Sequence, residues 1–192
     1  LFIPNPTNHT IFEKRKNTSL KTANTPFSSR LALYLIEKFI DYPTNRIVIL
    51  GATSGIGLEI AKLYIAAGWQ VGAAGRRTEN LEALRAAAPD RVKIRSIDIT
   101  APEAEERLLR LIADLGGCDL LLHCAGIGYN NPQLDAAREI ATAETNTVGF
   151  TRIMDTAFDY FRRQGGGHLA AISSIACLLY TSDAADEARS VD

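Results

Sequence analysis

The sequence contains little sulfur and has no excess of charge of either sign. Its three cysteines, Cys118, Cys124 and Cys177, are odd in number and lack the spacing of metal ligands, which argues against a disulfide framework and a metal site. A reduced, cytoplasmic setting is therefore expected. The net charge of −1 argues against nucleic acid or an acidic membrane surface as a partner. No apolar run is long enough to span a membrane, and the amino-terminal residues lack the pattern of a secretory signal.

The only methionine is Met154, so the chain does not start with one. We therefore expect a piece of a longer protein, or an open frame read from the edge of an assembled sequence. Residues 1–44 are rich in Asn, Thr, Ser and Pro with little periodicity, which predicts a disordered or non-native leader. A natural amino-terminal extension is the alternative.

Residues 46–57, RIVILGATSGIG, join a short apolar run to a glycine-rich turn. The run at 46–50 predicts a buried parallel strand, and apolar residues at helical spacing predict a helix over 58–67. Gly51 permits a tight turn, while Gly55 and Gly57 place no side chain between the backbone and a pyrophosphate. The free N–H groups at the helix start then face negative charge. These residues predict the first half of a dinucleotide-binding βαβ unit; a turn without a cofactor is the alternative.

The G-x-x-x-G-x-G spacing of residues 51–57 resembles the signature of the short-chain dehydrogenase/reductase family. The resemblance implies an α/β fold, a Rossmann-type doubly wound parallel sheet. About five strands are expected to be present and the carboxy-terminal third to be missing. The later strands are expected at 70–74, 92–97, 120–122 and 168–172. Helices are expected at 78–88 with Thr78 as its cap, from a capping box at Thr100 and Glu103 to 115, and at 144–163.

The end of the second strand indicates which nicotinamide cofactor is bound. Gly75 stands where an acidic residue would accept hydrogen bonds from the ribose of NAD, and Arg76 and Arg77 follow it. Guanidinium groups suit a 2′-phosphate, so NADP is expected over NAD; solvated surface charges are the alternative. The resemblance implies that Asp98, after the third strand, contacts the adenine ring, although it could be a simple turn-former.

Residues 123–126, HCAG, resemble the N-N-A-G motif of the family with both asparagines replaced. This replacement puts in doubt the usual tie from this loop to the central strand, although Ala125 and Gly126 still allow a close approach to the cofactor. His123 is expected to be structural. The residues expected to bind the cofactor are Gly51, Thr53, Ser54, Gly55, Ile56, Gly57, Arg76, Arg77, Asp98, Ala125 and Gly126.

The resemblance also implies two catalytic-site residues. Asn146 matches the asparagine that supports the proton relay, and Ser174 matches the serine that orients the substrate; an ordinary helix-start residue and a turn-former are the alternatives. The family's catalytic Tyr and Lys would stand 13 and 17 residues beyond Ser174, where the chain has Glu187 and Val191. Without the tyrosine to supply a proton and the lysine to lower its pKa, we expect this chain to be inactive.

Residues 177–187, CLLYTSDAADE, resemble the in-frame translation of a transposase-type sequencing adapter. The hypothesis is that natural sequence ends at Ala176, that 177–192 is an artefactual tail and that 45–176 is a partial NADP-binding domain. A chain cut there would leave its fifth strand as an exposed edge, so we expect poor solubility and marginal stability.

The parent protein is expected to be an NADP-dependent oxidoreductase. It would move a hydride between NADP(H) and a carbonyl or alcohol substrate, without a metal, and would be a homo-oligomer, which this chain alone would not be. The alternative is a non-catalytic NADP-binding or interaction module, which needs neither Tyr nor Lys.

Overall fold

The computed structural model describes residues 2–3 and 46–173 of the chain. At the middle of the sheet lies β2 (Arg46–Leu50), whose residues 47–50 are buried, as the apolar run predicted. It pairs in parallel with β3 (Gln70–Gly75) and with β5 (Leu120–His123), so Ile47 lies between Val71 and Leu120. A strand with neighbours on both sides and helices on both faces has no solvated side, which explains its continuous hydrophobicity.

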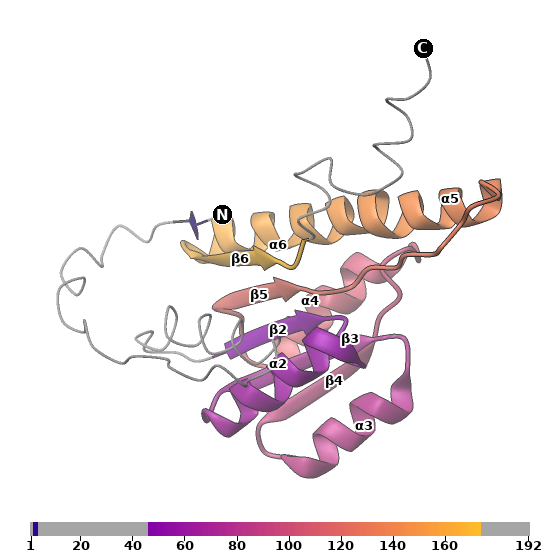
Figure 1. Ribbon diagram of the computed structural model, residues 1–192. Coiled ribbons are helices and arrows are strands. Elements are labelled where there is room, and N and C mark those ends of the chain that lie inside the picture. The colour runs from indigo at the N-terminus through magenta and orange to yellow at the C-terminus, as the bar shows by residue number, and fades with distance from the viewer. Residues whose placement is uncertain (1, 4–45, 174–192) are drawn as a thin grey trace, which may run out of the picture.

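The sheet continues outward from these three strands in the order β1-β6-β5-β2-β3-β4 (Figure 1). On one side β4 (Val92–Ser96) pairs in parallel with β3, and on the other β6 (Gly167–Ala171) pairs in parallel with β5. These five parallel strands confirm the predicted α/β, Rossmann-type sheet.

The outer edge of β6 carries one further strand, β1 (Phe2–Ile3), which pairs antiparallel with His168 and Gly167. The sequence predicted that these two residues belong to a disordered or non-native leader and that the edge of the fifth strand is exposed. The structure instead uses the unpaired N–H and C=O groups of that edge as a template for a short strand. The remaining residues of the predicted leader lie outside the described residues.

Two apolar clusters cover the two faces of the sheet. Ile47 and Ile49 of β2 face α2 (Gly55–Ala66) and α3 (Thr78–Ala87). Val48 and Leu50 point to the opposite face, where α4 (Ala104–Asp114) and α6 (Phe150–Gln164) supply the partners. Successive side chains of β2 therefore pack into the two cores in turn, as in a doubly wound sheet.

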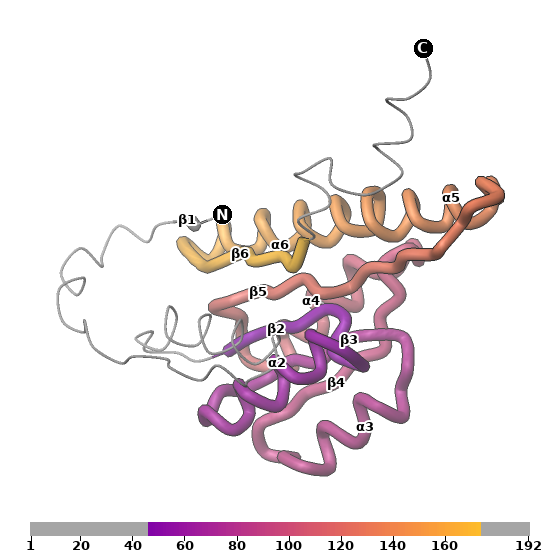
Figure 2. Tube along the Cα trace, in the orientation of Figure 1, coloured from indigo at the N-terminus to yellow at the C-terminus, as the bar shows by residue number. Residues whose placement is uncertain are grey.

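The last helical segment is longer and less regular than the sequence predicted. It begins with α5 (Ala136–Ala143), passes through a π-helical stretch, η1 (Glu144–Gly149), and continues as α6. Figure 2 shows the three stretches following one another as a single rod. The predicted start at residue 144 therefore falls at the beginning of the π-helical stretch.

Two predicted helix caps are wrong. Arg77 precedes α3, and Thr78 is its first helical residue. Glu103 precedes α4 without a side-chain cap, and the hydroxyl of Thr100 donates to Asp98 instead of capping the helix. Short polar side chains bond whichever backbone or side-chain group lies nearest, so local spacing alone does not fix their partner.

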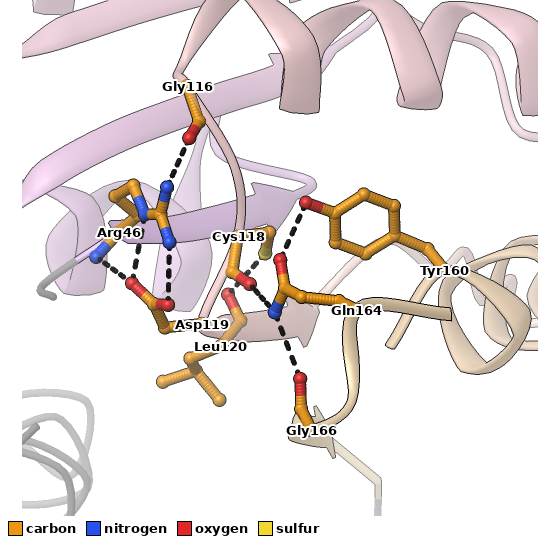
Figure 3. Close-up of polar contacts among 8 residues, drawn as sticks. All are labelled: Arg46, Gly116, Cys118, Asp119, Leu120, Tyr160, Gln164 and Gly166. Carbon is orange, nitrogen blue, oxygen red and sulfur yellow. Dashed lines mark hydrogen bonds and ion pairs between the residues drawn. The ribbon is translucent and has the colours of Figure 1, made fainter. Parts of the chain in front are cut away.

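A polar cluster joins the amino ends of β2 and β5 (Figure 3). Arg46 donates from its Nη2 to Asp119 Oδ1 (3.0 Å) and from its Nε to Asp119 Oδ2 (3.1 Å), and its Nη1 donates to the carbonyl of Gly116. Beside it, Gln164 Nε2 donates to the carbonyl oxygen of Cys118 (2.9 Å) and so ties the end of α6 to the start of β5. This cluster lies at the amino ends of the strands, opposite their carboxyl ends.

Candidate functional site

A cleft of about 620 Å³ lies at the carboxyl ends of the parallel strands. The chain runs from β2 outward to β4 and then crosses to β5 on the other side of β2, so the strand order reverses at this point. Such a switch point leaves a crevice, which is where open α/β sheets bind ligands. All eleven residues that the sequence assigned to cofactor binding line this one cleft.

The glycine turn after β2 is held in place by close backbone contacts. Gly51 has φ +87°, and a Cβ there would lie 2.7 Å from the backbone nitrogen of Ala125. A Cβ on Gly57 would lie 2.4 Å from the carbonyl oxygen of Gly51. Gly57 is therefore required by the packing of α2 on the turn, a reason different from the room for pyrophosphate that the sequence suggested. Gly55, with φ +54°, has open space at its Cβ position.

The start of α2 offers backbone donors to this cleft. The helix begins at Gly55 after Ser54, whose side chain makes no capping bond, and its first turn holds no acidic residue. Leu58 N, which donates to Ser54 O (3.3 Å), makes the first helical bond, so the preceding N–H groups have no partner within the helix. Unpaired N–H groups and the positive end of the helix dipole suit an anion.

The two arginines after β3 stand at the wall of the same cleft. Arg77 donates from Nε (3.3 Å) and Nη2 (3.0 Å) to Thr53 Oγ1, and from Nη2 to Ser54 Oγ. The sequence predicted Arg77 as a cofactor ligand but gave no sign of this link to the glycine turn. Asn80 of α3, which the sequence analysis missed, donates from Nδ2 to the carbonyl oxygen of Thr53 (2.7 Å).

Asp98 lines the cleft after β4 as an ionised acceptor. Partial burial raises its pKa, but hydrogen bonds from Thr100 N (3.0 Å) and Thr100 Oγ1 (2.7 Å), together with the charge of Arg76, lower it more. The pKa of Asp98 therefore lies below its ordinary value. Its carboxylate can accept a hydrogen bond from a ligand in the cleft.

His123 and Cys124, at and just after the end of β5, replace the two asparagines of the family motif. His123 is 2% exposed, and its ring lies edge-on to Phe150 with 5.0 Å between centroids. Its buried Nε2 has no hydrogen-bond partner among the residues that the structure describes. Burial lowers the pKa of His123 to about 4 and raises the pKa of Cys124 to about 12. His123 is thus neutral and structural at pH 7. Although both asparagines are replaced, backbone bonds still tie this loop to β2, because Cys124 N donates to Leu50 O (2.8 Å).

Asn146 lies in η1 and is hydrogen-bonded to the loop that follows β5. Its Oδ1 accepts from Ile127 N (2.9 Å), and its Nδ2 donates to Ile127 O (2.7 Å). Ile127 itself lines the cleft. Ser174, the other predicted catalytic residue, lies outside the described residues.

A sequence profile described as short chain dehydrogenase matches residues 45–185. The chain belongs to the short-chain dehydrogenase family. The match includes residues 177–185, part of the segment that the sequence predicted to be artefactual. This membership agrees with the cleft, which combines the glycine turn, the strand switch point and the paired arginines.

Relatives and solved structures match about two thirds of the chain. An uncharacterized oxidoreductase of Mycobacterium tuberculosis is 32% identical over 140 residues, covering 68% of this chain and 55% of the relative. The crystal structure of a short-chain dehydrogenase from Streptomyces avermitilis matches with a TM-score of 0.64 at 31% identity, covering 71% of this chain and 51% of that one. A variant of actinorhodin polyketide ketoreductase, solved with NADPH, matches with a TM-score of 0.62 at 27% identity and covers 68% and 53%.

The chain spans about half the length of the curated relatives that it matches. Within the residues that the structure describes, no cluster of acidic, histidine or cysteine side chains could hold a metal ion. Nor does that part of the chain contain a helix long and apolar enough to cross a bilayer.

Several residues that line the cleft were not predicted from the sequence. They are apolar or small, so no charge or motif marks them. Ile97 and Ile99 flank Asp98 in the sequence, so their position next to a predicted site residue is the one signal that marks them. The missed lining residues are Leu50, Ile97, Ile99, Cys124, Ile127, Thr145 and Ile172.

Proposed function

We propose that this short-chain dehydrogenase binds NADP(H) in the cleft, and that the whole protein transfers a hydride between NADP(H) and a carbonyl or alcohol substrate. The observation that carries the proposal is the end of β3, where Gly75 leaves no carboxylate and Arg77 is fastened to the glycine turn. A guanidinium there suits a 2′-phosphate, whereas it has no acceptor for the proton of a ribose 2′-hydroxyl, which an acidic residue would supply.

The residues present fit such a dinucleotide. Gly51 and Gly57 bring backbone against backbone, which leaves the N–H groups at the start of α2 for the pyrophosphate. Arg76 and Arg77 would hold the 2′-phosphate, and Asp98 would accept from the adenine amino group. Bound NADPH supplies the hydride. The ketoreductase with NADPH, at 27% identity, supports the cofactor.

Two residues would act on the substrate side. Ser174 would orient the substrate oxygen with its hydroxyl. Asn146 would act through the backbone of Ile127, to which both its amide atoms are bonded. We propose that this chain binds the nucleotide without turnover, because Glu187 and Val191 stand where the family has its Tyr and Lys. A carboxylate and an apolar side chain can neither supply the phenolic proton nor lower its pKa.

The alternative is a non-catalytic NADP-binding or interaction module, because the residues of the cleft need neither Tyr nor Lys. Sequencing the source gene past codon 176 separates the two. A continuation with Tyr and Lys 13 and 17 residues beyond Ser174 supports the reductase, and an intact gene ending in the present tail supports the module.

We further propose that the whole protein is cytoplasmic, acts on a small-molecule substrate and has no nucleic-acid partner. We propose that the whole protein forms homo-oligomers, whereas the present chain alone does not.

The test is titration of the full chain with NADP⁺ and with NAD⁺ by calorimetry. We expect NADP⁺ to bind at least about tenfold more tightly, since a charged hydrogen bond contributes about 1.5–3 kcal/mol. Arg77→Ala should remove most of that difference, while Arg85→Ala, an exposed arginine of α3 that pairs with Glu82, should leave it intact. Equal affinities for the two nucleotides in the unaltered chain would show that the proposed preference is wrong.

A further inference from the structure

Thr53 joins the glycine turn to the end of β3 through both branches of its side chain. Its Oγ1 accepts from Arg77 Nε (3.3 Å) and Nη2 (3.0 Å). Its Cγ2 fills the space beside Gly75, where a Cβ would lie only 2.6 Å away. The side chain is 5% exposed, and Asn80 Nδ2 holds the Thr53 carbonyl from the other side (2.7 Å).

The two branches cannot move independently, because both are fixed to the same Cβ and turn together about χ1. A side chain at position 75 would have to displace Cγ2. Turning Thr53 to make that room would take its hydroxyl away from Arg77. Since φ of Gly75 lies outside the left-handed region, this contact with Thr53 is what opposes a side chain there.

We propose that Thr53 is a specificity-determining residue for the nucleotide: its methyl group closes position 75 to an acidic side chain, and its hydroxyl holds Arg77 for a 2′-phosphate. This role rests on the proposed binding of NADP in the same cleft. Thr53 and Ser54 engage Nε and Nη2 of Arg77, while Nη1 has no partner among the described residues and is the donor left for a phosphate oxygen. A guanidinium ordered in advance loses less freedom when the phosphate binds.

The two halves of the role can be separated by two substitutions. Thr53→Val keeps the branched shape and removes the hydroxyl, whereas Thr53→Ser keeps the hydroxyl and removes the methyl group. Thr156→Val is the matched control, because Thr156 Oγ1 bonds within α6 to Arg152 O (2.8 Å), in a different part of the chain. The probes are adenosine 2′,5′-bisphosphate and AMP, which differ only in the 2′-phosphate.

In the full chain, we expect Thr53→Val to weaken the bisphosphate about tenfold and to change AMP less than about twofold, as for a lost hydrogen bond to a charged group. Thr53→Ser and Thr156→Val should keep the preference of the unaltered chain. If Thr53→Val binds the bisphosphate as tightly as the unaltered chain does, the role of Thr53 is refuted and NADP binding stands. If the unaltered chain binds neither probe, both the NADP proposal and the specificity role are overturned.

A second measurement tests the steric coupling without any ligand. Gly75→Ala should lower the midpoint of thermal unfolding, and the loss should shrink by at least about half in a Thr53→Ser background, because contacting residues show non-additive effects. The same loss in both backgrounds would overturn the coupling between Thr53 and position 75, whatever the nucleotide titrations show.

Discussion

At the scale of single residues, the turn after β2 tolerates a side chain least at Gly51. Its φ is +87°, and a Cβ would lie within 3 Å of three backbone atoms of Cys124 and Ala125. A backbone cannot retreat as the tip of a flexible side chain can. Two features therefore require glycine at position 51: its left-handed backbone conformation and the close approach of the loop after β5.

We predict that Gly51→Ala lowers the free energy of unfolding by about 3 kcal/mol, from a left-handed residue and an overpacked contact together. Gly116→Ala is the control, since Gly116 has a similar φ of +78° but open space at its Cβ position. It should cost only about 1 kcal/mol. Urea unfolding measures both, and equal losses would mean that the contact with Ala125 is immaterial.

A second residue-scale prediction concerns His123, whose buried Nε2 has no partner within the described part of the chain. Burial lowers its pKa from 6.5 to about 4 in the folded chain. Below pH 6.5 the unfolded chain therefore binds a proton that the folded chain does not, so the stability contributed by neutral His123 is complete above pH 6.5 and is lost as pH falls toward 4. The loss should reach about 3 kcal/mol.

His123→Asn removes this titration. The unfolding free energy of the variant should fall less steeply between pH 6.5 and 4 than that of the unaltered chain. Comparing the two slopes also cancels the contribution of His168, whose pKa burial lowers as well. Parallel slopes would show that His123 is protonated equally in both states.

At the scale of elements, the polar cluster of Figure 3 joins the amino ends of β2 and β5. Asp119 accepts from Arg46 N (2.9 Å) as well as from its guanidinium, so one carboxylate holds both the backbone and the side chain of β2. Both side chains are largely shielded, with exposed fractions of 24% for Arg46 and 13% for Asp119. Shielding from water makes this pair stronger than an ordinary surface ion pair.

We predict that Asp119→Ala lowers the unfolding free energy by about 2–3 kcal/mol, because it leaves a partly buried guanidinium and a backbone N–H without their acceptor. Glu106→Ala breaks the exposed pair with Arg110 and should cost less than about 0.5 kcal/mol. Thermal or urea unfolding of the two variants gives the comparison. A loss as small as that of Glu106→Ala would show that the cluster does not stabilise the sheet.

At the scale of the whole molecule, the two ends of the sheet differ. The cleft lies at the carboxyl ends of the strands, and the polar cluster lies at their amino ends. The long rod from α5 to α6 exposes apolar side chains, with Ile140 58% and Val148 53% accessible. Exposed apolar side chains favour association between molecules. This agrees in direction with the poor solubility expected from the sequence, which stays a prediction.

We predict that the unaltered chain sediments as a mixture of species whose size grows with concentration. Ile140→Gln together with Val148→Gln should raise the monomer fraction, because it removes two exposed apolar contacts. Replacing two buried residues of the same kinds, Ile153 and Val71, by glutamine should instead unfold the chain. A monodisperse, sharply melting sample of the unaltered chain would contradict the prediction.

The sequence by itself determined the alternation of strands and helices and the glycine turn. Residues 46–50 form β2 as predicted, and Gly51 lies in the predicted turn, although α2 begins at Gly55, before the predicted helix start at residue 58. These features depend on the period of apolar residues and on backbone freedom, which act between near neighbours. The strand order then brought the predicted cofactor residues into one cleft, as the switch-point rule requires.

Only the tertiary structure decided which distant side chains meet. Thr53 with Gly75 and Arg77, Asn146 with Ile127, and the two-residue strand β1 at the edge of β6 are contacts between segments that no local pattern connects. The failed capping box at Thr100 has a local cause instead, since its hydroxyl donates to Asp98, two residues earlier in the chain. Periodicity fixes which face of an element is buried, but the partner of a polar group depends on what packing brings within about 3 Å of it.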